Sequence, residues 1–200
     1  MRTALATFLV LLTGVGMLWT ATDGARAFTT EGARRLDIRE SPRPVPALIL
    51  QDHTGSRFGL ERFRGSWVVL DFIYTRCADL CITAGNTLSE IRDGLPDKRL
   101  GRDVSLLSIS FDPTHDQLPQ LEYYARRYRA HADHWSIART SEPDRLPALL
   151  DTFGVTVIPD GWGGYEHNAA MYVIDPGGRL VAIFDYDDPS AVLVFLEGRP

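Results

Sequence analysis

The feature that most constrains this sequence is an apolar run at residues 67–74, which reads WVVLDFIY and ends shortly before Cys77. β-Branched and aromatic residues dominate the run, and this composition is typical of a strand buried on both faces. The run stops at Thr75-Arg76, where polar residues replace the apolar ones. The sequence therefore predicts a central strand with a thiol at its carboxyl end.

Cys77 and Cys81 are the 2 cysteines of a chain of 200 residues. If residues 78–87 begin a helix, as their composition allows, positions four apart lie on one helical face. The two sulfurs could then meet one ligand or each other. The alternative is that both are small buried apolar residues. Their isolation at a strand-to-helix junction favours a shared chemical role.

The remaining segments alternate between strand and helix patterns. Further strands are predicted at 47–50, 104–111, 135–138, 169–174 and 180–184, and helices at 88–95, 117–130, 144–153 and 189–196. Asp175-Pro176-Gly177-Gly178 is a turn signal that joins the last two strands as a hairpin. This order predicts an α/β fold with a central mixed β-sheet flanked by helices.

The amino-terminal part predicts export. Residues 1–27 combine a positive charge, an apolar stretch and Ala25-Arg26-Ala27, whose small residues match a signal-peptidase site. Residues 4–21 carry no charge and are also long enough to act as an uncleaved membrane anchor. Residues 28–46 contain Pro42, Pro44 and Pro46 and are expected to form an extended linker to a domain at 47–200.

Charge and histidine positions limit the possible partners. The net charge is −5 and Lys and Arg do not cluster, which argues against a nucleic-acid partner.

His53 is expected to be a solvated turn residue. His115 lies beside Asp112 and Asp116, a pattern typical of turn and helix-cap chemistry. His131 and His134 are expected to complement a helix carboxyl end. From pattern alone, His167 is more typical of a surface or hydrogen-bonding residue than of a ligand.

Three motifs resemble the Sco/SenC family, thioredoxin-fold proteins associated with copper delivery to cytochrome c oxidase. They are FIYTRCADLC at 72–81, SISFDP at 108–113 with Asp116 and Pro119 after it, and HNAAMYVIDPGG at 167–178. The resemblance spans about residues 47–197. It implies a thioredoxin-like fold and a copper site formed by Cys77, Cys81 and His167. It also implies a cytochrome c oxidase copper-binding subunit as partner, a possible periplasmic copper donor and a possible membrane tether.

The sequence departs from the family pattern at two places. Ile82 follows the second cysteine, where the family usually has proline, so the loop could be looser although no ligand is lost. Thr114-His115-Asp116 stands where the family more often has charged or arginine-bearing residues. The second difference leaves a role of this loop in partner recognition open.

The donor set suits copper. Thiolate sulfur favours Cu(I), and imidazole accepts both Cu(I) and Cu(II), whereas a structural zinc site normally has four protein ligands. In an exported compartment the same cysteines could instead exchange dithiol and disulfide. The thioredoxin motif, however, has two residues between its cysteines and this chain has Ala78, Asp79 and Leu80. Asp79 should oppose thiolate formation and a helix amino terminus should favour it, so the balance stays open.

A glycine-rich loop at 159–166 precedes His167. It contains Trp162 and Tyr165, and it either moves to bring the imidazole onto the metal or covers the sheet edge.

Three functions follow from these residues and the resemblance. The first is an extracytoplasmic (periplasmic) copper metallochaperone, which is not an enzyme in the turnover sense. The second is a thiol-disulfide oxidoreductase that keeps the acceptor's copper-ligand cysteines reduced, with Cys77 as the attacking thiol. A peroxiredoxin-like peroxidase is a third and weaker reading.

Overall fold

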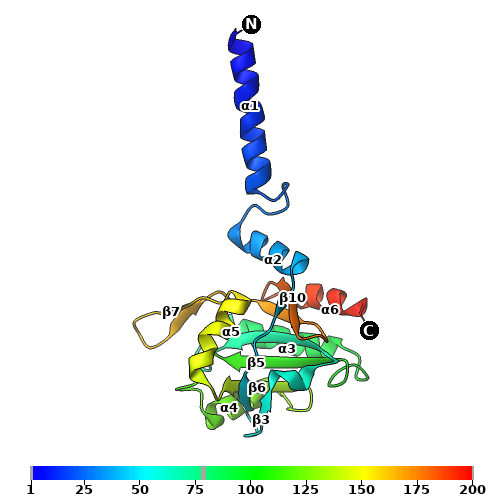
Figure 1. Ribbon diagram of the computed structural model, residues 1–200. Helices are drawn as coiled ribbons and strands as arrows, with labels where there is room; N and C mark the ends of the chain where they lie inside the picture. Colours follow the sequence, from blue (N-terminus) through cyan, green and yellow to red (C-terminus); the bar gives the residue numbers. More distant parts are fainter. Residues whose placement is uncertain (1, 78–79, 200) are drawn as a thin grey trace. The chain divides into compact units, whose positions relative to one another are not determined.

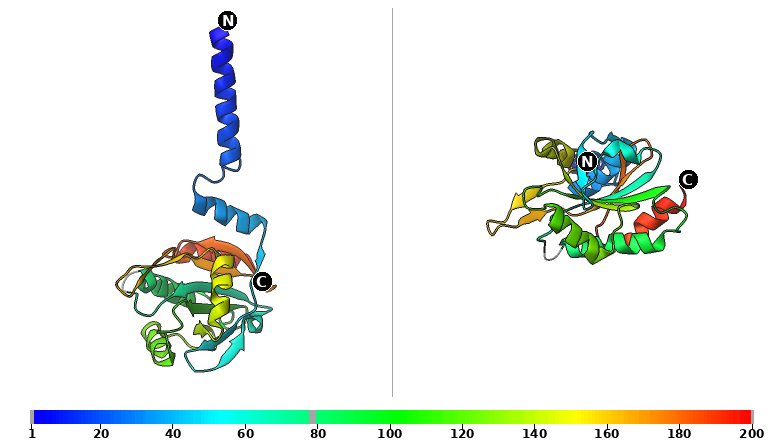
Figure 2. Two further views of the ribbon diagram at one scale, coloured as in Figure 1. Left: turned by 60° about the vertical axis from the view of Figure 1, so that its left-hand side comes forward. Right: turned by 90° about the horizontal axis from the view of Figure 1, so that it is seen from below.

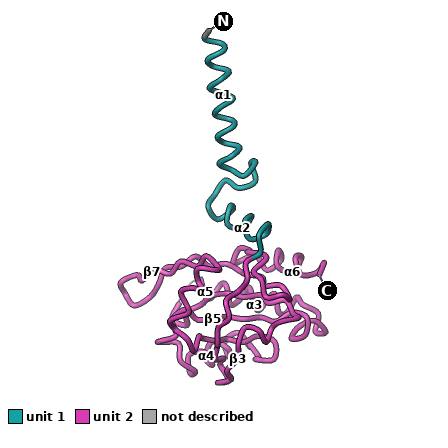
Figure 3. Tube along the Cα trace, viewed as in Figure 1, with its two compact units in different colours: residues 1–42 teal, residues 43–200 magenta. Residues whose placement is uncertain are grey.

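The computed structural model describes residues 2–77 and 80–199. It divides into two compact units, Met1–Pro42 and Arg43–Pro200 (Figure 3). The first unit contains helix α1 (Arg2–Ala21), which is long and apolar enough to cross a membrane. A signal sequence near an amino terminus has the same features. Either role fits the expected export.

The segment at 28–46, which was expected to be extended, contains helix α2 (Thr30–Glu40). The Thr29 hydroxyl accepts a hydrogen bond from the Gly32 N–H at 2.9 Å and caps the helix. Glu31 pairs with Arg34 and with Arg35 at 2.8 Å, one turn further on. Local capping and charge pairs therefore form a helix in a segment whose prolines lie beyond its carboxyl end.

The second unit is built on a mixed sheet (Figure 1). Among the named strands of the described residues, β4–β5 and β5–β6 pair in parallel and the other pairs in this sheet are antiparallel. The fold class predicted from the sequence, α/β with a central mixed sheet, is confirmed. In spatial order the described strands are β1 (Arg43–Pro44), β10 (Arg179–Phe184), β9 (Met171–Ile174), β4 (Trp67–Ile73), β5 (Val104–Ser110), β6 (Trp135–Thr140), β2 (Ile49–Asp52) and β3 (Arg57–Gly59).

Helices cover both faces of the sheet. Three of them, α3 (Leu80–Gly94), α4 (Leu118–Tyr128) and α6 (Pro189–Glu197), lie on one face, and α5 (Leu146–Phe153) lies on the other (Figure 2). Two 3₁₀ helices, η1 (Leu60–Phe63) and η2 (Pro143–Arg145), lie in the connections. The apolar run that predicted a central strand is β4, which is buried at all positions after Trp67.

A short hairpin replaces the expected glycine-rich loop. Strands β7 (Val157–Pro159) and β8 (Tyr165–His167) pair antiparallel, and His167 is the last residue of β8 rather than part of a loop. The turn between them closes because the Asp160 carboxylate accepts hydrogen bonds from the N–H groups of Trp162 and Gly164. Gly161 and Gly163 adopt positive φ values of 78° and 90°, which glycine reaches without strain.

Candidate metal centre

Cys77 lies in the segment between β4 and α3, and Cys81 lies at the start of α3. The Cys77 N–H donates to the Tyr74 carbonyl at 3.1 Å, which turns the chain after the strand. Cys81 lies in the first turn of α3, and its N–H donates to Cys77 Sγ at 3.2 Å. Both residues are present as thiols, Cys81 buried and Cys77 partly exposed. Ala78 and Asp79 lie outside the described residues, so the opposing effects expected of Asp79 and the helix terminus stay a prediction.

Two aspartates from the β5–α4 connection fix the loop that carries Cys77. Asp116 is fully buried and accepts hydrogen bonds from the Thr75 N–H at 3.0 Å, the Thr75 hydroxyl at 2.6 Å and the Ser110 hydroxyl at 2.5 Å. Arg76 donates to Asp112 at 2.7 Å. The cluster around His115, predicted as turn chemistry, therefore also anchors the thiol loop.

Hydrogen bonds from neighbouring residues stabilise the ionised form of Asp112. Burial alone would raise the pKa of this carboxyl, but hydrogen bonds from His115 and Arg76 outweigh it and hold the pKa below the usual range. Because the carboxylate stays ionised, its pairing with Arg76 holds the loop in place.

His167, the third residue of the predicted site, lies at the end of β8 and next to the Cys81 thiol. His167 Nε2 lies 3.7 Å from Cys81 Sγ. One ligand atom from each of Cys77, Cys81 and His167 can be chosen so that all lie within 4.8 Å of one another. The Nδ1 of His167 is buried and has no hydrogen-bonding partner among the described residues. The structure thus brings together the three residues that the family resemblance implied, and their role as ligands remains a proposal.

The aromatic rings of Phe111 and Tyr74 pack against the imidazole of His167. The ring of Phe111 lies 5.0 Å from that of His167, and the ring of Tyr74 lies 6.2 Å from it. The Tyr74 hydroxyl donates to the Tyr165 carbonyl at 3.2 Å and accepts from the Tyr165 N–H at 3.4 Å. Sequence reasoning gave Tyr74 and Phe111 no role. Each ends an apolar run of a parallel strand, and the carboxyl ends of such strands meet at one edge of a sheet, which was the available signal.

The surroundings of Cys81 favour its protonated thiol. A hydrogen-bonding interaction with Cys77 and burial raise the pKa of the Cys81 thiol well above its ordinary value. Cys81 therefore keeps its proton until a metal or another electrophile binds the sulfur and displaces the proton, since a cysteine ligand must be deprotonated.

Other histidines lie apart from this cluster. Within residues 2–77 and 80–199, Cys77, Cys81 and His167 form the one group of three or more His, Cys, Asp or Glu residues with metal-binding proximity. His53 lies in a turn as expected, but it is half-buried rather than solvated, and its Nδ1 accepts a hydrogen bond from the Ile137 N–H at 3.2 Å. Burial lowers the pKa of its imidazole. The hydrogen bonds between His53 and Ile137 therefore extend the pairing of β2 with β6.

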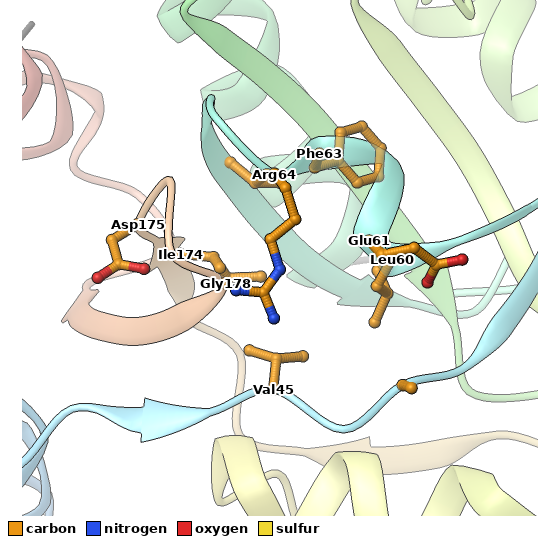
Figure 4. A pocket seen from close by; sticks show the side chains of 10 residues that line it. Val45, Leu60, Glu61, Phe63, Arg64, Ile174, Asp175 and Gly178 are labelled. Carbon is orange, nitrogen blue, oxygen red and sulfur yellow. The ribbon is translucent and has the colours of Figure 1, made fainter.

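A small cavity of about 70 Å³ lies elsewhere in the second unit (Figure 4). It is lined by Val45, Leu60, Ile174 and Arg64, among others, and the Arg64 side chain extends toward Val45. None of the three clustered residues lines it. The cavity is therefore separate from the candidate site, in which Cys77 is partly exposed and Cys81 is buried.

Comparison with known proteins relates the chain to one family. A family model described as SCO1/SenC matches residues 39–194. The chain is 31% identical over 144 residues to a "Putative copper-binding protein" of Stutzerimonas stutzeri, covering 69% of this chain and 67% of the relative.

Solved structures agree in fold. Arabidopsis thaliana ScoI with copper bound aligns with a TM-score of 0.65 at 21% identity, over 78% of this chain and 99% of ScoI. BsSco, described as a member of the Sco family of cytochrome c oxidase assembly proteins, aligns with a TM-score of 0.68 at 20% identity, over 79% of this chain and 94% of BsSco. The thioredoxin-like class expected from the sequence is confirmed.

Proposed function

This chain belongs to the SCO1/SenC family, and on that premise we propose that it is an exported copper metallochaperone. It holds one copper ion with Cys77, Cys81 and His167 and delivers it to the copper-binding subunit of cytochrome c oxidase. Copper binding is supported by the relative named as a copper-binding protein and by the copper-bound ScoI of like fold. Delivery to the oxidase is supported by the description of BsSco as a member of a family of oxidase assembly proteins.

The observation that carries the proposal is the meeting of three donor atoms within 4.8 Å from two distant parts of the chain. Two sulfurs and one imidazole form a soft set that suits Cu(I) and also accepts Cu(II). Three ligands leave room in the coordination shell for an acceptor's ligand to enter before the protein releases its own. Partial exposure of Cys77 gives that ligand a side from which to approach.

The surrounding residues position the donors for exchange. Asp112 and Asp116 fix the loop before Cys77, and Tyr74 holds β8 so that His167 faces the sulfurs. When copper arrives, Cys81 releases its proton and becomes a ligand, so binding should weaken as the pH falls. Phe111 shields one side of the imidazole from water.

Metal analysis of the reduced protein after dialysis tests this function. The wild type should retain one copper per chain, and Cys77→Ser or Cys81→Ser should lose the tight site because each removes a soft donor. His167→Ala should weaken binding or change the Cu(II) absorption and electron-spin spectra. His131→Ala, which changes a histidine outside the cluster, is the matched control. Stoichiometric copper on the double cysteine variant would overturn the proposal.

A thiol-disulfide oxidoreductase is the second candidate, and one observation favours it. The Cys81 N–H donates to the sulfur of the more exposed Cys77, while the Cys81 thiol stays protonated, an arrangement that suits attack by Cys77. Dithiol exchange does not need His167. If cells with His167→Ala assemble a fully metallated oxidase under copper limitation while Cys77→Ser cells do not, the oxidoreductase function replaces the copper carrier.

A further inference from the structure

The tip of the β7–β8 hairpin exposes a large apolar surface. Trp162 is 94% exposed and Ile158 on β7 is 54% exposed. The hairpin projects from the body of the second unit (Figures 1 and 2). A tryptophan in this position gains nothing from burial in the chain itself, and tryptophan is the residue type most enriched among the residues that dominate protein interfaces.

Hydrogen bonds order the backbone of the turn that carries Trp162. The Asp160 carboxylate accepts from the Trp162 N–H at 2.7 Å and from the Gly164 N–H at 2.9 Å. The Asp160 N–H in turn donates to the Gly164 carbonyl at 3.1 Å. Because the backbone is already ordered on both sides of Trp162, little conformational entropy is lost when a partner binds the ring.

The hairpin is continuous with the candidate metal centre. His167 ends β8, and the Tyr74 hydroxyl holds Tyr165 against the end of β4. Arg76 Nη1 lies 3.9 Å from the position of a β-carbon built on Gly163, so the tip of the hairpin borders the loop of Cys77. A protein whose ligand reaches the three donor atoms therefore has the hairpin beside it.

Charge indicates the chemistry of that protein. Residues 157–167 contain Asp160 and Glu166 and no Lys or Arg. Arg76, which lies beside the tip of the hairpin, is paired with Asp112 at 2.7 Å. An acidic hairpin is repelled by an anionic lipid surface, although tryptophan also favours membrane interfaces. A protein surface with basic residues around an apolar pocket complements both features.

We propose that the β7–β8 hairpin docks the protein that exchanges copper with this chain. Trp162 enters an apolar pocket of that protein, and Lys or Arg residues at the rim of the pocket face Asp160 and Glu166. The inference rests on the proposed copper-carrier function and adds to it the surface that recognises the partner.

Copper transfer measured in two ways tests the inference. Copper-loaded full chain in detergent micelles is mixed with the apo copper-binding domain of the oxidase subunit from the same organism, and separately with a small copper chelator. Trp162→Ala should slow transfer to the protein acceptor roughly tenfold or more, because an interface residue of this kind contributes that much. Removal by the chelator should be unchanged, because the three donors are intact.

Two further variants sharpen the comparison. Tyr123→Ala removes an exposed aromatic ring on α4, 61% exposed, and should transfer copper at the wild-type rate. Glu166→Lys should slow transfer to the protein acceptor most at low ionic strength, because salt screens the lost attraction.

Each other outcome counts against the inference in a distinguishable way. Equal transfer by wild type and Trp162→Ala overturns the docking role and leaves the copper carrier standing. Fluorescence quenching by brominated phosphatidylcholine vesicles can be compared between the wild type and Trp162→Phe, and the difference reports Trp162. If Trp162 is quenched and Trp162→Ala transfers copper at the wild-type rate, the hairpin binds the membrane instead. A wild-type chain that cannot be loaded with copper overturns the proposed function, and the docking inference falls with it.

Discussion

At the scale of single residues, Asp71 is a buried carboxyl group in the centre of the sheet. It lies within β4, is 1% exposed, and neither carboxylate oxygen has a partner of hydrogen-bonding geometry among the described residues. Burial raises its pKa from 3.8 to about 7. The folded chain therefore holds a proton that the unfolded chain releases above pH 4.

We expect the contribution of Asp71 to the stability of the metal-free protein to become less favourable as the pH rises from about 4 to 8. Between the two pKa values the folded state binds more protons than the unfolded state, so raising the pH favours unfolding. The shift from 3.8 to about 7 corresponds to a cost on the order of 4 kcal/mol once the group is ionised in both states. Asp71→Asn removes this cost, and urea unfolding should show a gain that grows from pH 4 to pH 8.

Asp187→Asn provides the control, since this exposed aspartate should have a small effect at every pH. A gain from Asp71→Asn that stays constant over the pH range would show that the carboxyl is not protonated in the folded chain.

At the scale of elements, Tyr74 makes two hydrogen bonds that help attach the β7–β8 hairpin. The phenol of Tyr74 both donates to and accepts from the backbone of Tyr165, and its ring lies 5.3 Å from that of Tyr165 and 5.3 Å from that of Phe111. The hydroxyl fixes the orientation of β8, and β8 carries His167. The position of the third donor is thus set by a residue three positions before the first thiol.

Tyr74→Phe should lower copper affinity by roughly five- to tenfold, because loss of hydrogen bonds worth about 1 kcal/mol lets β8 shift while the ring contacts stay. Competition with a chelator measures the affinity, and the Cu(II) electron-spin spectrum reports the imidazole. Tyr123→Phe, which removes the hydroxyl of an exposed ring on α4, should leave both unchanged. Wild-type affinity and spectrum in Tyr74→Phe would show that other contacts hold the hairpin.

The elements that the sequence predicted share one property: each follows from an unbroken apolar pattern. Strands β4 and β5 and helix α4 read directly from such patterns. The β7–β8 hairpin was missed because Val157–Pro159 is short, partly exposed and contains proline, and because Tyr74, far away in sequence, holds it. Helix α2 was missed because the prolines after it outweighed the Thr29 cap and the Glu31 ion pairs, which were visible signals.

At the scale of the whole molecule, the sequence indicated which three residues cluster, but not which contacts hold them in place. The family resemblance implied the cluster of Cys77, Cys81 and His167, and the pattern of apolar strands implied the sheet that carries it. The sequence did not show that Asp112 and Asp116 hold the thiol loop, or that Phe111 packs on the imidazole. These contacts join different strand ends and depend on the register of the folded sheet.

The first unit contains a helix with the length and composition of a membrane span. Helix α1 has 20 residues, a length of about 30 Å, which matches the hydrocarbon core of a bilayer. Its large apolar side chains, among them Phe8 and Leu9, are 53–72% exposed. Such a surface does not remain in water, so α1 is either held in the membrane or removed after export.

We expect removal after Ala27, because Ala25-Arg26-Ala27 presents the small residues that signal peptidase requires. Terminal sequencing of exported protein should then read Phe28, and the protein should appear in the soluble fraction. Ala25→Leu together with Ala27→Leu places bulky residues at both small positions and should keep the full chain in the membrane pellet. Wild-type protein that begins at Met1 or Arg2 and sediments with membranes would instead make α1 a permanent anchor, and the copper carrier would then act tethered to the bilayer.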